Sequence, residues 1–576
     1  MIKVNFLITL LIIIINANAI GEEVIFRQLN KGEVRSVHEA KSKKFMIATQ
    51  GKNSTNAGSK MYQLGGNIID AFTAISFVIS VERPQSTGLG GGGFALYLPS
   101  KSLKPTSFDF REIAPIRSTS KMYLDKNGNE IKFKSRNGVF SVGIPGLVAG
   151  VLKMHKKYGK LPLSQVLKPA IELARKGLIV NPELNYAMKV RKKILYKYPS
   201  SRKIFLKQDG SVYKIGEKLF QKDLANTIEL ISKDGASIFY NGIISKQIYE
   251  QSKALGGIIT LEDFKKYKVL ERPAVQGKFK SYDVFSMGPP SSGGVHILEI
   301  LNMIENYPIK KWGIQNEKTI HVIAMSMQQA FADRAKFLGD PDFVNVPIKT
   351  LTSKSYARKM SKKFSLERYR TAKKVYPGQI NIKEHDHTTH FTIADNTGAV
   401  ISSTQTINGY FGSGVVAEGT GIVLNNEMDD FATKVGASNL FGAIGGKNNL
   451  IKPFKRPLSS MSPTIVLKNN KPILALGSPS GTRILTCVAQ SIINYIVFGL
   501  DLYKSISLTR FHHQWMPDYL RVEESGFNSK TTKALLKMGY KIKYNNLGCK
   551  VQAIAFESQM LHGVSDIRGA GFAFGK

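Results

Sequence analysis

One predicted hairpin places two threonines, Thr388 and Thr406, opposite each other. Residues Thr388 to Asp395 alternate as a strand does, and residues 396–398 (Asn-Thr-Gly) form the turn that follows. This pattern predicts a β-hairpin with a three-residue loop whose glycine takes the left-handed conformation. In that register Asp395 pairs with Ala399 and Thr388 faces Thr406. One threonine hydroxyl is therefore expected beside another at the start of a strand.

A threonine at the start of a strand, preceded by a polar loop, suits a nucleophile that becomes a new N-terminus. The Thr388 hydroxyl would attack an acyl carbon, and its own freed α-amine, with a pKa of about 7.7–8.0, would be the base. Threonine-rich hairpins are more often structural, so the spacing alone leaves both interpretations open.

Three other motifs suggest different chemistries. Residues 88–93 match the Gly-x-Gly-x-x-Gly dinucleotide fingerprint, but a strand follows where a helix is required. Residues 477–481 (Gly-Ser-Pro-Ser-Gly) have proline at the nucleophile position of a serine hydrolase elbow. We expect only the backbone N–H groups of Ser480 and Gly481 to act, as an oxyanion hole. The histidines of residues 385–390 fit no standard zinc spacing, so we expect neither a metal nor a cofactor.

The composition is that of a globular protein with an ordinary apolar core. The chain has 576 residues, of which 43% are hydrophobic and 21% charged, and this length favours two to four folding units. Two cysteines, Cys487 and Cys549, allow one bridge at most. The net charge of +39 raises the alternatives of nucleic acid or an anionic membrane as partner. The basic runs lack interleaved aromatic residues and any known nucleic-acid signature, which favours a solvated basic surface and no nucleic-acid partner.

The first 19 residues have the three parts of a secretory signal peptide. Lys3 precedes an apolar run over residues 6–15, and Ala17-Asn18-Ala19 ends it. An uncleaved anchor is the alternative, but the run is too short to cross a bilayer stably. We expect export with cleavage after Ala19, to the periplasm or beyond, and no transmembrane anchor.

Hydrophobic periodicity gives a coarse map of the elements. A helical run is expected to open within residues 65–71 and to continue to Val81. Further helices are expected over 145–177, from about 295, near 485–498 and near 530–538, and strands at 94–98 and around Val284. Residues 350–387 are polar and basic and show no hydrophobic period. The pattern changes most clearly at 387/388, where short alternating strands begin.

These residues together resemble the γ-glutamyltransferase (γ-glutamyl transpeptidase) family, and the resemblance covers nearly the whole chain after residue 19. It rests on several long blocks in the family's order: GGNIIDA at 65–71, GLGGGGF at 88–94, DFREIAP at 109–115, PPSSGG at 289–294, TTHFTIAD at 388–395, LNNEMDDF at 424–431, RPLSSMSPTIV at 456–466, GSPSGTR at 477–483 and RFHHQW at 510–515.

The resemblance implies the N-terminal-nucleophile hydrolase fold, an α+β protein built as a four-layer αββα sandwich. The family is made as a precursor that cuts itself, here between His387 and Thr388. The products would be a large subunit, residues 20–387, and a small subunit, residues 388–576, that stay associated as a heterodimer.

The resemblance also implies the reaction. Thr388 would form a γ-glutamyl-enzyme from glutathione or another γ-glutamyl donor and pass the acyl group to water, an amino acid or a peptide. Thr406 would orient the nucleophile, and Ser480 and Gly481 would form the oxyanion hole.

The donor's charged end would meet residues of both signs. Arg111, with Ser459 and Ser460, would bind the α-carboxylate, because a planar guanidinium suits two oxygens. Residues implied to hold the α-ammonium are Asn408, Glu427 and Asp430. Residues 432–447 align with the family's lid, in which Phe441 would shield the substrate.

Some positions depart from the family pattern, and two other functions stay open. Ser480 replaces a usual glycine, Gln405 stands where an aromatic residue is frequent, and Ile567 replaces a usual proline. One alternative is an acylase for cephalosporin or glutaryl side chains, which would not need the ammonium-binding residues. The other is a non-enzymatic protein that binds anions through its basic surface and does not depend on Thr388.

Overall fold

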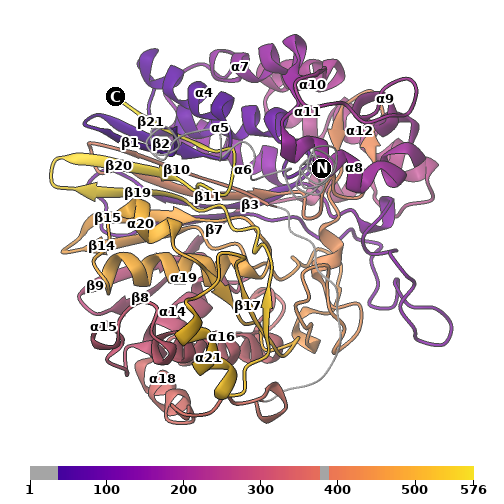
Figure 1. The fold of residues 1–576 in the computed structure, drawn as a ribbon. Helices are drawn as coiled ribbons and strands as arrows, with labels where there is room; N and C mark the ends of the chain where they lie inside the picture. Colours follow the sequence, from indigo (N-terminus) through magenta and orange to yellow (C-terminus); the bar gives the residue numbers. More distant parts are fainter. Residues whose placement is uncertain (1–36, 376–387) are drawn as a thin grey trace, which may run out of the picture.

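Two stacked seven-stranded antiparallel sheets form the centre of the computed structural model, which describes residues 37–375 and 388–576 (Figure 1). Sheet A has the order β1-β20-β19-β15-β14-β9-β8, and sheet B the order β21-β2-β10-β11-β3-β4-β7. The predicted signal peptide and His387 lie outside the described residues.

The strands of both sheets are short. Sheet A contains β1 (Glu39–Ser42), β8 (Val275–Phe279), β9 (Tyr282–Ser286), β14 (Thr464–Lys468), β15 (Lys471–Gly477), β19 (Gln552–Glu557) and β20 (Met560–Ser565). Sheet B contains β2 (Phe45–Thr49), β3 (Gly92–Leu98), β4 (Thr106–Phe110), β7 (Leu270–Pro273), β10 (Thr389–Asp395), β11 (Val400–Thr406) and β21 (Phe572–Gly575). Smaller pairings involve β5 (Leu178–Ile179), β6 (Lys218–Leu219), β12 (Val416–Ala417), β13 (Ile422–Val423), β16 (Phe511–His512), β17 (Leu520–Val522) and β18 (Ile542–Tyr544).

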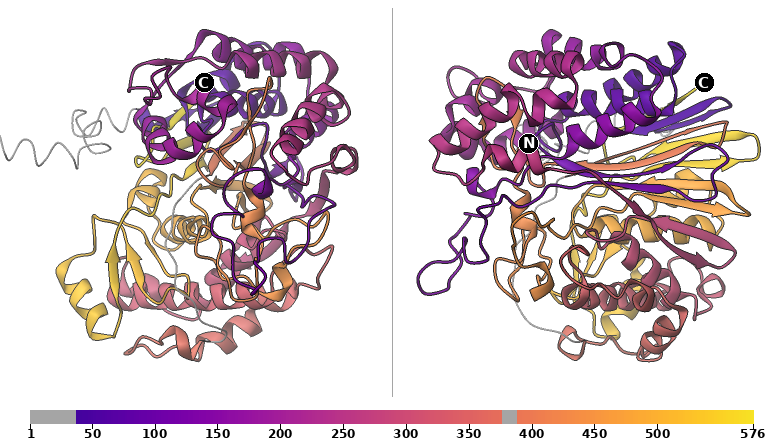
Figure 2. Two further views of the ribbon diagram at one scale, coloured as in Figure 1. Left: turned by 90° about the vertical axis from the view of Figure 1, so that its right-hand side faces the viewer. Right: turned by 180° about the vertical axis from the view of Figure 1, so that it is seen from behind.

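Helices cover the outer face of each sheet, which gives four layers (Figures 1 and 2). On the side of sheet B lie α4 (Lys52–Gln63), α5 (Ile68–Glu82), α6 (Leu147–Tyr158), α7 (Leu163–Lys176), α8 (Pro182–Lys197), α9 (Pro199–Phe205), α10 (Lys222–Asp234), α11 (Ala236–Tyr240) and α12 (Ile243–Ala254). On the side of sheet A lie α14 (Gly293–Ile304), α15 (Ile309–Trp312), α16 (Glu317–Phe337), α18 (Lys354–Ser361), α19 (Arg483–Ile496), α20 (Leu502–Ser507) and α21 (Ser529–Lys537). Two further short helices are α13 (Leu261–Lys266) and α17 (Ile348–Leu351). The predicted αββα sandwich is confirmed.

Each sheet takes strands from both sides of the 387/388 boundary. In sheet B, β10, β11 and β21 follow the boundary, whereas β2, β3, β4 and β7 precede it. Sheet A is mixed in the same way, since β14, β15, β19 and β20 lie between β1 and β9. The change of pattern is therefore not a domain boundary. The expectation of two to four separate folding units is wrong for the described chain, because its two halves complete the same sheets.

Helix α5 shows how local sequence fixes one of the covering elements. The Asn67 side chain accepts hydrogen bonds from the N–H groups of Ile69 and Asp70, and Asp70 in turn accepts from the Asn67 N–H. This capping box begins the helix. All fifteen of its residues are buried, which explains why the run is apolar on every side. The predicted helical run to Val81 is confirmed, as is the strand after the glycine-rich turn, β3.

Residues 350–375 are more helical than the sequence indicated. Helix α18 begins after Ser353, whose side chain accepts a hydrogen bond from the Tyr356 N–H. Its buried face contains Ala357 and Met360, three positions apart. Two apolar residues among lysines are too few to produce a visible period, so the expectation of no regular pattern is wrong there.

The hairpin of β10 and β11 has the predicted register. Asp395 donates its N–H to the Ala399 carbonyl at 3.1 Å, and the ladder runs on to Thr389 opposite Gln405. One step further, Thr388 comes opposite Thr406. Gly398 has φ = 85°, the left-handed conformation expected for this loop.

Polar side chains, rather than only apolar ones, join the two sheets beneath this hairpin. The His390 Nδ1 lies 2.8 Å from Thr404 Oγ1, and Ser402 donates to the Leu476 carbonyl of sheet A at 3.1 Å. Burial lowers the pKa of His390 to about 3, so its imidazole is neutral at physiological pH. These bonds satisfy groups that are removed from water between the sheets.

Within the two described ranges, no helix combines the length and the apolar character that crossing a bilayer requires.

Gly477→Ala is expected to destabilise the fold. A Cβ atom at Gly477 would lie 2.2 Å from the His390 ring, and neither residue can move easily in a close-packed core. We expect a loss of about 1–3 kcal/mol in the free energy of unfolding, measured by denaturant titration. Gly88→Ala is the matched control, because its nearest neighbour would be 3.9 Å away. Equal stability of the two variants would contradict this account.

Candidate active site

One small pocket at the end of the sandwich brings the predicted residues together. Thr388, Thr406 and Gly481 line it, with all seven residues predicted for substrate binding: Arg111, Asn408, Glu427, Asp430, Phe441, Ser459 and Ser460. Ser480 does not line the pocket itself. Five lining residues were not predicted from the sequence: Arg334, Asn439, Met461, Thr482 and Ile484. Residues from most of the chain's length therefore converge here.

Thr388 lies immediately before the first residue of β10 and is 6% exposed. Opposite it, at the end of β11, Thr406 accepts a hydrogen bond at its Oγ1 from the backbone N–H of Asn408, 2.8 Å away. Asn408 has φ = 71°, and its side chain donates to the Asn426 carbonyl at 2.9 Å. The turn at Asn408 thus fixes the Thr406 hydroxyl by a backbone hydrogen bond. This hydroxyl lies on the same side of the pocket as Thr388.

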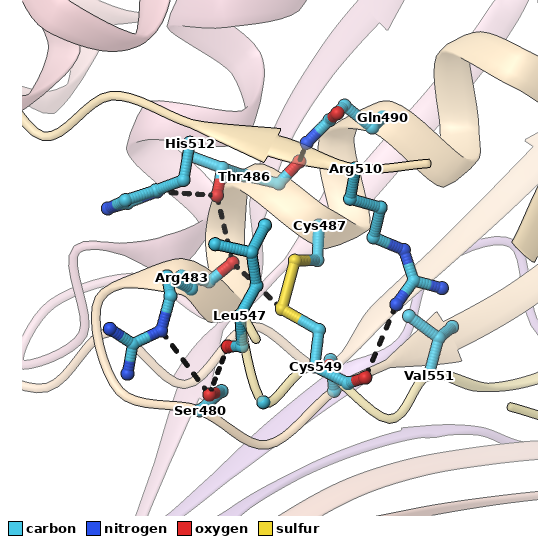
Figure 3. The surroundings of a disulfide bond; sticks show 12 residues. Ser480, Arg483, Thr486, Cys487, Gln490, Arg510, His512, Leu547, Cys549 and Val551 are labelled. Carbon is cyan, nitrogen blue, oxygen red and sulfur yellow. Dashed lines mark hydrogen bonds between the residues drawn. A yellow bond between two sulfur atoms is a disulfide. The ribbon is translucent and has the colours of Figure 1, made fainter. Parts of the chain in front are cut away.

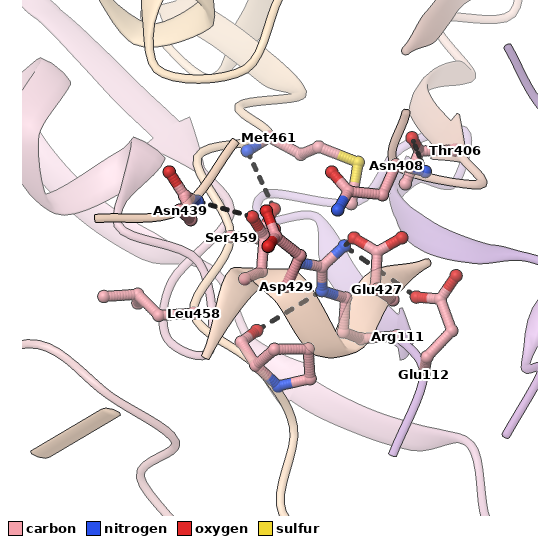
Figure 4. A network of polar contacts seen from close by, with 12 residues as sticks. Arg111, Glu112, Thr406, Asn408, Glu427, Asp429, Asn439, Leu458, Ser459 and Met461 are labelled. Atoms are coloured by element: carbon pink, nitrogen blue, oxygen red, sulfur yellow. Dashed lines mark hydrogen bonds and ion pairs between the residues drawn. The ribbon is translucent and has the colours of Figure 1, made fainter. Parts of the chain in front are cut away.

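A buried guanidinium stands among three carboxylates at the other side of the pocket (Figure 4). Arg111, 1% exposed, bonds the Glu427 carboxylate with Nη1 and Asp430 Oδ2 with Nη2, the latter at 2.5 Å. The Glu112 carboxylate lies 3.8 Å away, and Nε donates to the Pro457 carbonyl at 3.3 Å. All three acids are buried.

One guanidinium cannot offset three buried carboxylates. Burial raises the pKa of Glu427 well above its ordinary value, because the pull of Arg111 is opposed by Glu112 and Asp430. Burial likewise raises the pKa of Glu112 to about 7, although Arg111 lowers it. Glu112 and Glu427 therefore retain protons near neutral pH, and a cation bound beside them would favour their ionised forms.

The turn before α19 reaches the pocket at Gly481. Ser480 has φ = 109° and Gly481 φ = 53°, and helix α19 begins two residues later. A helix N-terminus favours negative charge. A Cβ atom at Gly481 would lie 2.2 Å from the Phe441 ring, so glycine is needed there. Ser480 adopts a backbone conformation unusual for any residue but glycine, and its side chain donates to the Leu547 carbonyl at 2.7 Å.

A disulfide secures the loop that receives the Ser480 hydroxyl (Figure 3). Cys487, in α19, is bonded to Cys549, two residues after Leu547, and both cysteines are fully buried. Lys550 adds a backbone hydrogen bond to the Ser478 side chain at 3.1 Å. The sequence left this pairing open; in the structure it ties the loop to the helix behind the turn.

The predicted lid segment, residues 432–447, covers the pocket. It contains one antiparallel bridge, Ser438 with Ile444, and its Asn439 side chain donates to Asp430 Oδ1 at 2.6 Å. Phe441 is 5% exposed and lies against Gly481. The segment therefore contacts both the carboxylate cluster, at Asp430, and the turn before α19, at Gly481.

Gln514, in the block RFHHQW, joins the lid to the turn and was missed as a site residue. Its Nε2 donates to the carbonyls of Phe441 (3.4 Å) and Gly442 (3.2 Å). Its Oε1 accepts from the Thr482 hydroxyl at 2.9 Å. The neighbouring side chain points elsewhere, since the Trp515 indole donates to the Val375 carbonyl. No local pattern in this block singles out Gln514, because the strand β16 ends at His512 and Trp515 has φ = 67°.

Glu112→Gln should change the pH dependence of stability. The folded state keeps a proton on Glu112 up to about pH 7, whereas the unfolded chain releases it near its ordinary pKa, so the wild type loses stability as pH rises between these values. The amide cannot ionise. We expect the variant to gain about 1–3 kcal/mol relative to wild type between pH 4.5 and pH 8, measured by denaturant titration at each pH. The exposed Glu524→Gln is the control, and a pH-independent difference would refute the assignment.

Replacing both cysteines by alanine should lower stability without separating any chains. The bridge spans 62 positions, and the chain-entropy model assigns such a loop about 4 kcal/mol. We expect a clear fall in the thermal midpoint of the double variant and no further fall on adding a reductant. Equal midpoints for the wild type and the variant would show that the bridge contributes nothing.

The comparisons with known proteins agree with this geometry. The family model described as Gamma-glutamyltranspeptidase matches residues 54–575. A "Glutathione hydrolase proenzyme" of Escherichia coli (strain K12) is 41% identical over 533 residues, which covers 92% of this chain and 91% of that protein.

Solved structures show the same fold. A cephalosporin acylase from Bacillus halodurans has a TM-score of 0.82 at 26% identity, covering 93% of this chain and 96% of the other. A chain of Helicobacter pylori gamma-glutamyltranspeptidase has a TM-score of 0.56 at 39% identity, covering 58% of this chain and 96% of the other. With a family match over nearly the whole chain and the family's blocks gathered in one pocket, this chain belongs to the γ-glutamyltranspeptidase family.

Proposed function

We propose that this protein is an exported γ-glutamyltransferase and glutathione hydrolase that matures by cutting its own backbone between His387 and Thr388. The carrying observation is that Thr388, at the start of β10, lines the same buried pocket as the Arg111 cluster. A nucleophile and a charge-selective binding site therefore share one enclosure. The relative named "Glutathione hydrolase proenzyme", 41% identical, supports both the substrate and the processing.

Maturation follows from the chemistry of the threonine. The Thr388 Oγ attacks the carbonyl carbon of His387, the peptide C–N bond breaks, and an ester to Oγ replaces it. Water then opens the ester, which leaves a carboxylate on His387 and a free α-amine and hydroxyl on Thr388. The large subunit (20–387) and the small subunit (388–576) would stay together, because both sheets contain strands of each.

The mature residue then carries out acyl transfer. The Thr388 α-amine takes the hydroxyl proton as Oγ bonds to the donor's γ-carbonyl carbon. The N–H groups of Ser480 and Gly481 stabilise the oxyanion, and Thr406 orients the nucleophile. The leaving amine takes the proton as the C–N bond breaks. Water, an amino acid or a peptide then attacks the ester and regenerates Thr388.

The α-amino acid end of the donor matches the charges of the pocket. Arg111 is bonded to Glu427 and Asp430 in the structure. The donor's carboxylate would bind the Arg111 guanidinium beside Ser459 and Ser460. The donor's ammonium would bind the two acids and Asn408. Because the donor brings one negative and one positive group, its binding adds no net charge to the buried cluster. The desolvation free energy of binding is therefore partly offset by the new ion pairs.

The acid cluster also distinguishes this function from that of an acylase of the same fold. Glu427 and Asp430 are fully or largely buried, and a donor without an α-ammonium would leave them without a cationic partner. We therefore propose glutathione and other γ-glutamyl compounds as donors. Turnover of a glutaryl donor faster than of glutathione would favour the acylase instead.

A denaturing gel of Thr388→Ala tests the proposal. The wild type should give two chains, residues 20–387 and 388–576, with or without reductant, because both cysteines lie in the smaller one. Thr388→Ala should give one chain and no glutathione hydrolysis, since it lacks the attacking hydroxyl. The N-terminal sequence of the smaller chain should be Thr-Thr-His-Phe.

Thr389→Ala is the matched control for that experiment. Its hydroxyl is buried one residue away but donates to Gln50 Oε1 at 2.7 Å, outside the pocket lining. This variant should be processed and active. A wild type that stays as a single inactive chain would refute the proposed function.

A further inference from the structure

A second arginine lines the pocket and has no role in the account so far. Arg334 lies near the end of α16 and is 3% exposed. Its Nε donates to Ser292 Oγ at 3.2 Å and its Nη2 to the Leu458 carbonyl at 3.3 Å. Among the described residues, its bonded partners are thus neutral, and no carboxylate lies within ion-pair distance of it.

The two arginines of the pocket therefore differ in their charge balance. Arg111 is bonded to Glu427 and Asp430, with Glu112 nearby. Arg334 is equally enclosed but is bonded only to a hydroxyl and a carbonyl. Burial lowers its pKa to about 10, with Asp430 opposing and Arg111 reinforcing this effect. A buried charge without a counter-ion is unfavourable, so an anion bound beside Arg334 would be stabilised.

Arg334 is fixed beside the two serines that we assign to the donor's carboxylate. Ser292, its Nε partner, donates to the Ser459 carbonyl with its backbone N–H at 2.9 Å and with its hydroxyl at 3.0 Å. Leu458, whose carbonyl accepts from Nη2, directly precedes Ser459. Two sequence blocks, PPSSGG and RPLSSM, thus hold the guanidinium against the segment that contains Ser459 and Ser460.

We infer that Arg334 is a substrate-binding residue whose guanidinium supplies the uncompensated positive charge met by the donor's α-carboxylate at Ser459 and Ser460. The inference rests on the proposed function. The carboxylate would lie between Arg334 and Arg111, and Glu427 and Asp430 would receive the α-ammonium. This division gives the pocket a positive charge for an anion, although Arg111 is bonded to Glu427 and Asp430 in the structure.

Two donors that differ only at the α-carboxylate separate a binding role from a structural one. One is γ-glutamyl-p-nitroanilide, and the other is the same compound with a carboxamide in place of the α-carboxylate. Arg334→Met should lower kcat/KM for the carboxylate donor about 10- to 100-fold and leave the carboxamide donor nearly unchanged. Arg334→Lys, which keeps the charge, should retain most of the preference for the carboxylate donor.

Lys336→Met is the matched control, because Lys336 is an exposed cation on the same helix. It should leave the activity on both donors unchanged. Ser292→Ala removes the Nε partner of Arg334 together with one of the two bonds to the Ser459 carbonyl. It should lower kcat/KM for the carboxylate donor more than for the carboxamide donor.

An equal loss on both donors in Arg334→Met would overturn the inference and assign Arg334 a structural role. If Arg334→Met is not processed into two chains, Ser292→Ala decides: a donor preference equal to that of the wild type in this variant would refute the inference. A wild type that is unprocessed and inactive would instead refute the proposed function, so the two failures are distinguishable.

Discussion

The pairing of β10 with β11 is the constraint on which the site depends. Its register runs from Ala394 opposite Val400 to Thr389 opposite Gln405, and it ends with Thr388 facing Thr406. A shift by one residue would turn every side chain of β10 to the other face. The strand is held on its other side by β2 and from below by sheet A. Thr388, the proposed nucleophile, is thus placed by a fully buried ladder in the middle of the sandwich.

The second constraint is the burial of charged side chains around Arg111 and Arg334. Three carboxylates surround Arg111, while Arg334 is bonded to neutral groups. Such an arrangement is costly for a fold that only needs stability. It suits a protein whose ligand has a carboxylate and an ammonium on the same carbon atom. These two groups would pair with the arginine and the carboxylates whose charges the protein itself does not balance.

The rim of the pocket depends on contacts between segments remote in sequence. The turn at Ser480 is tied to the 547–549 loop by one hydroxyl and, through α19, by the disulfide. Gln514 joins the lid carbonyls to Thr482. The positions that depart from the family pattern need not weaken the site, since the Ser480 side chain gains a partner where glycine would have none.

The sequence alone predicted the four-layer fold class, the hairpin register and the principal pocket residues, because these follow from local periodicity, turn chemistry and ordered motifs that resemble a known family. It could not predict Arg334 or Gln514 as site residues, the Cys487–Cys549 bridge, or the mixing of both halves in each sheet. It also missed α18, whose two buried apolar residues leave little trace among lysines. Those features depend on which distant segments meet, and no local pattern encodes a contact across the sandwich; only the folded chain brings Arg334 to Ser292 and Gln514 to the lid.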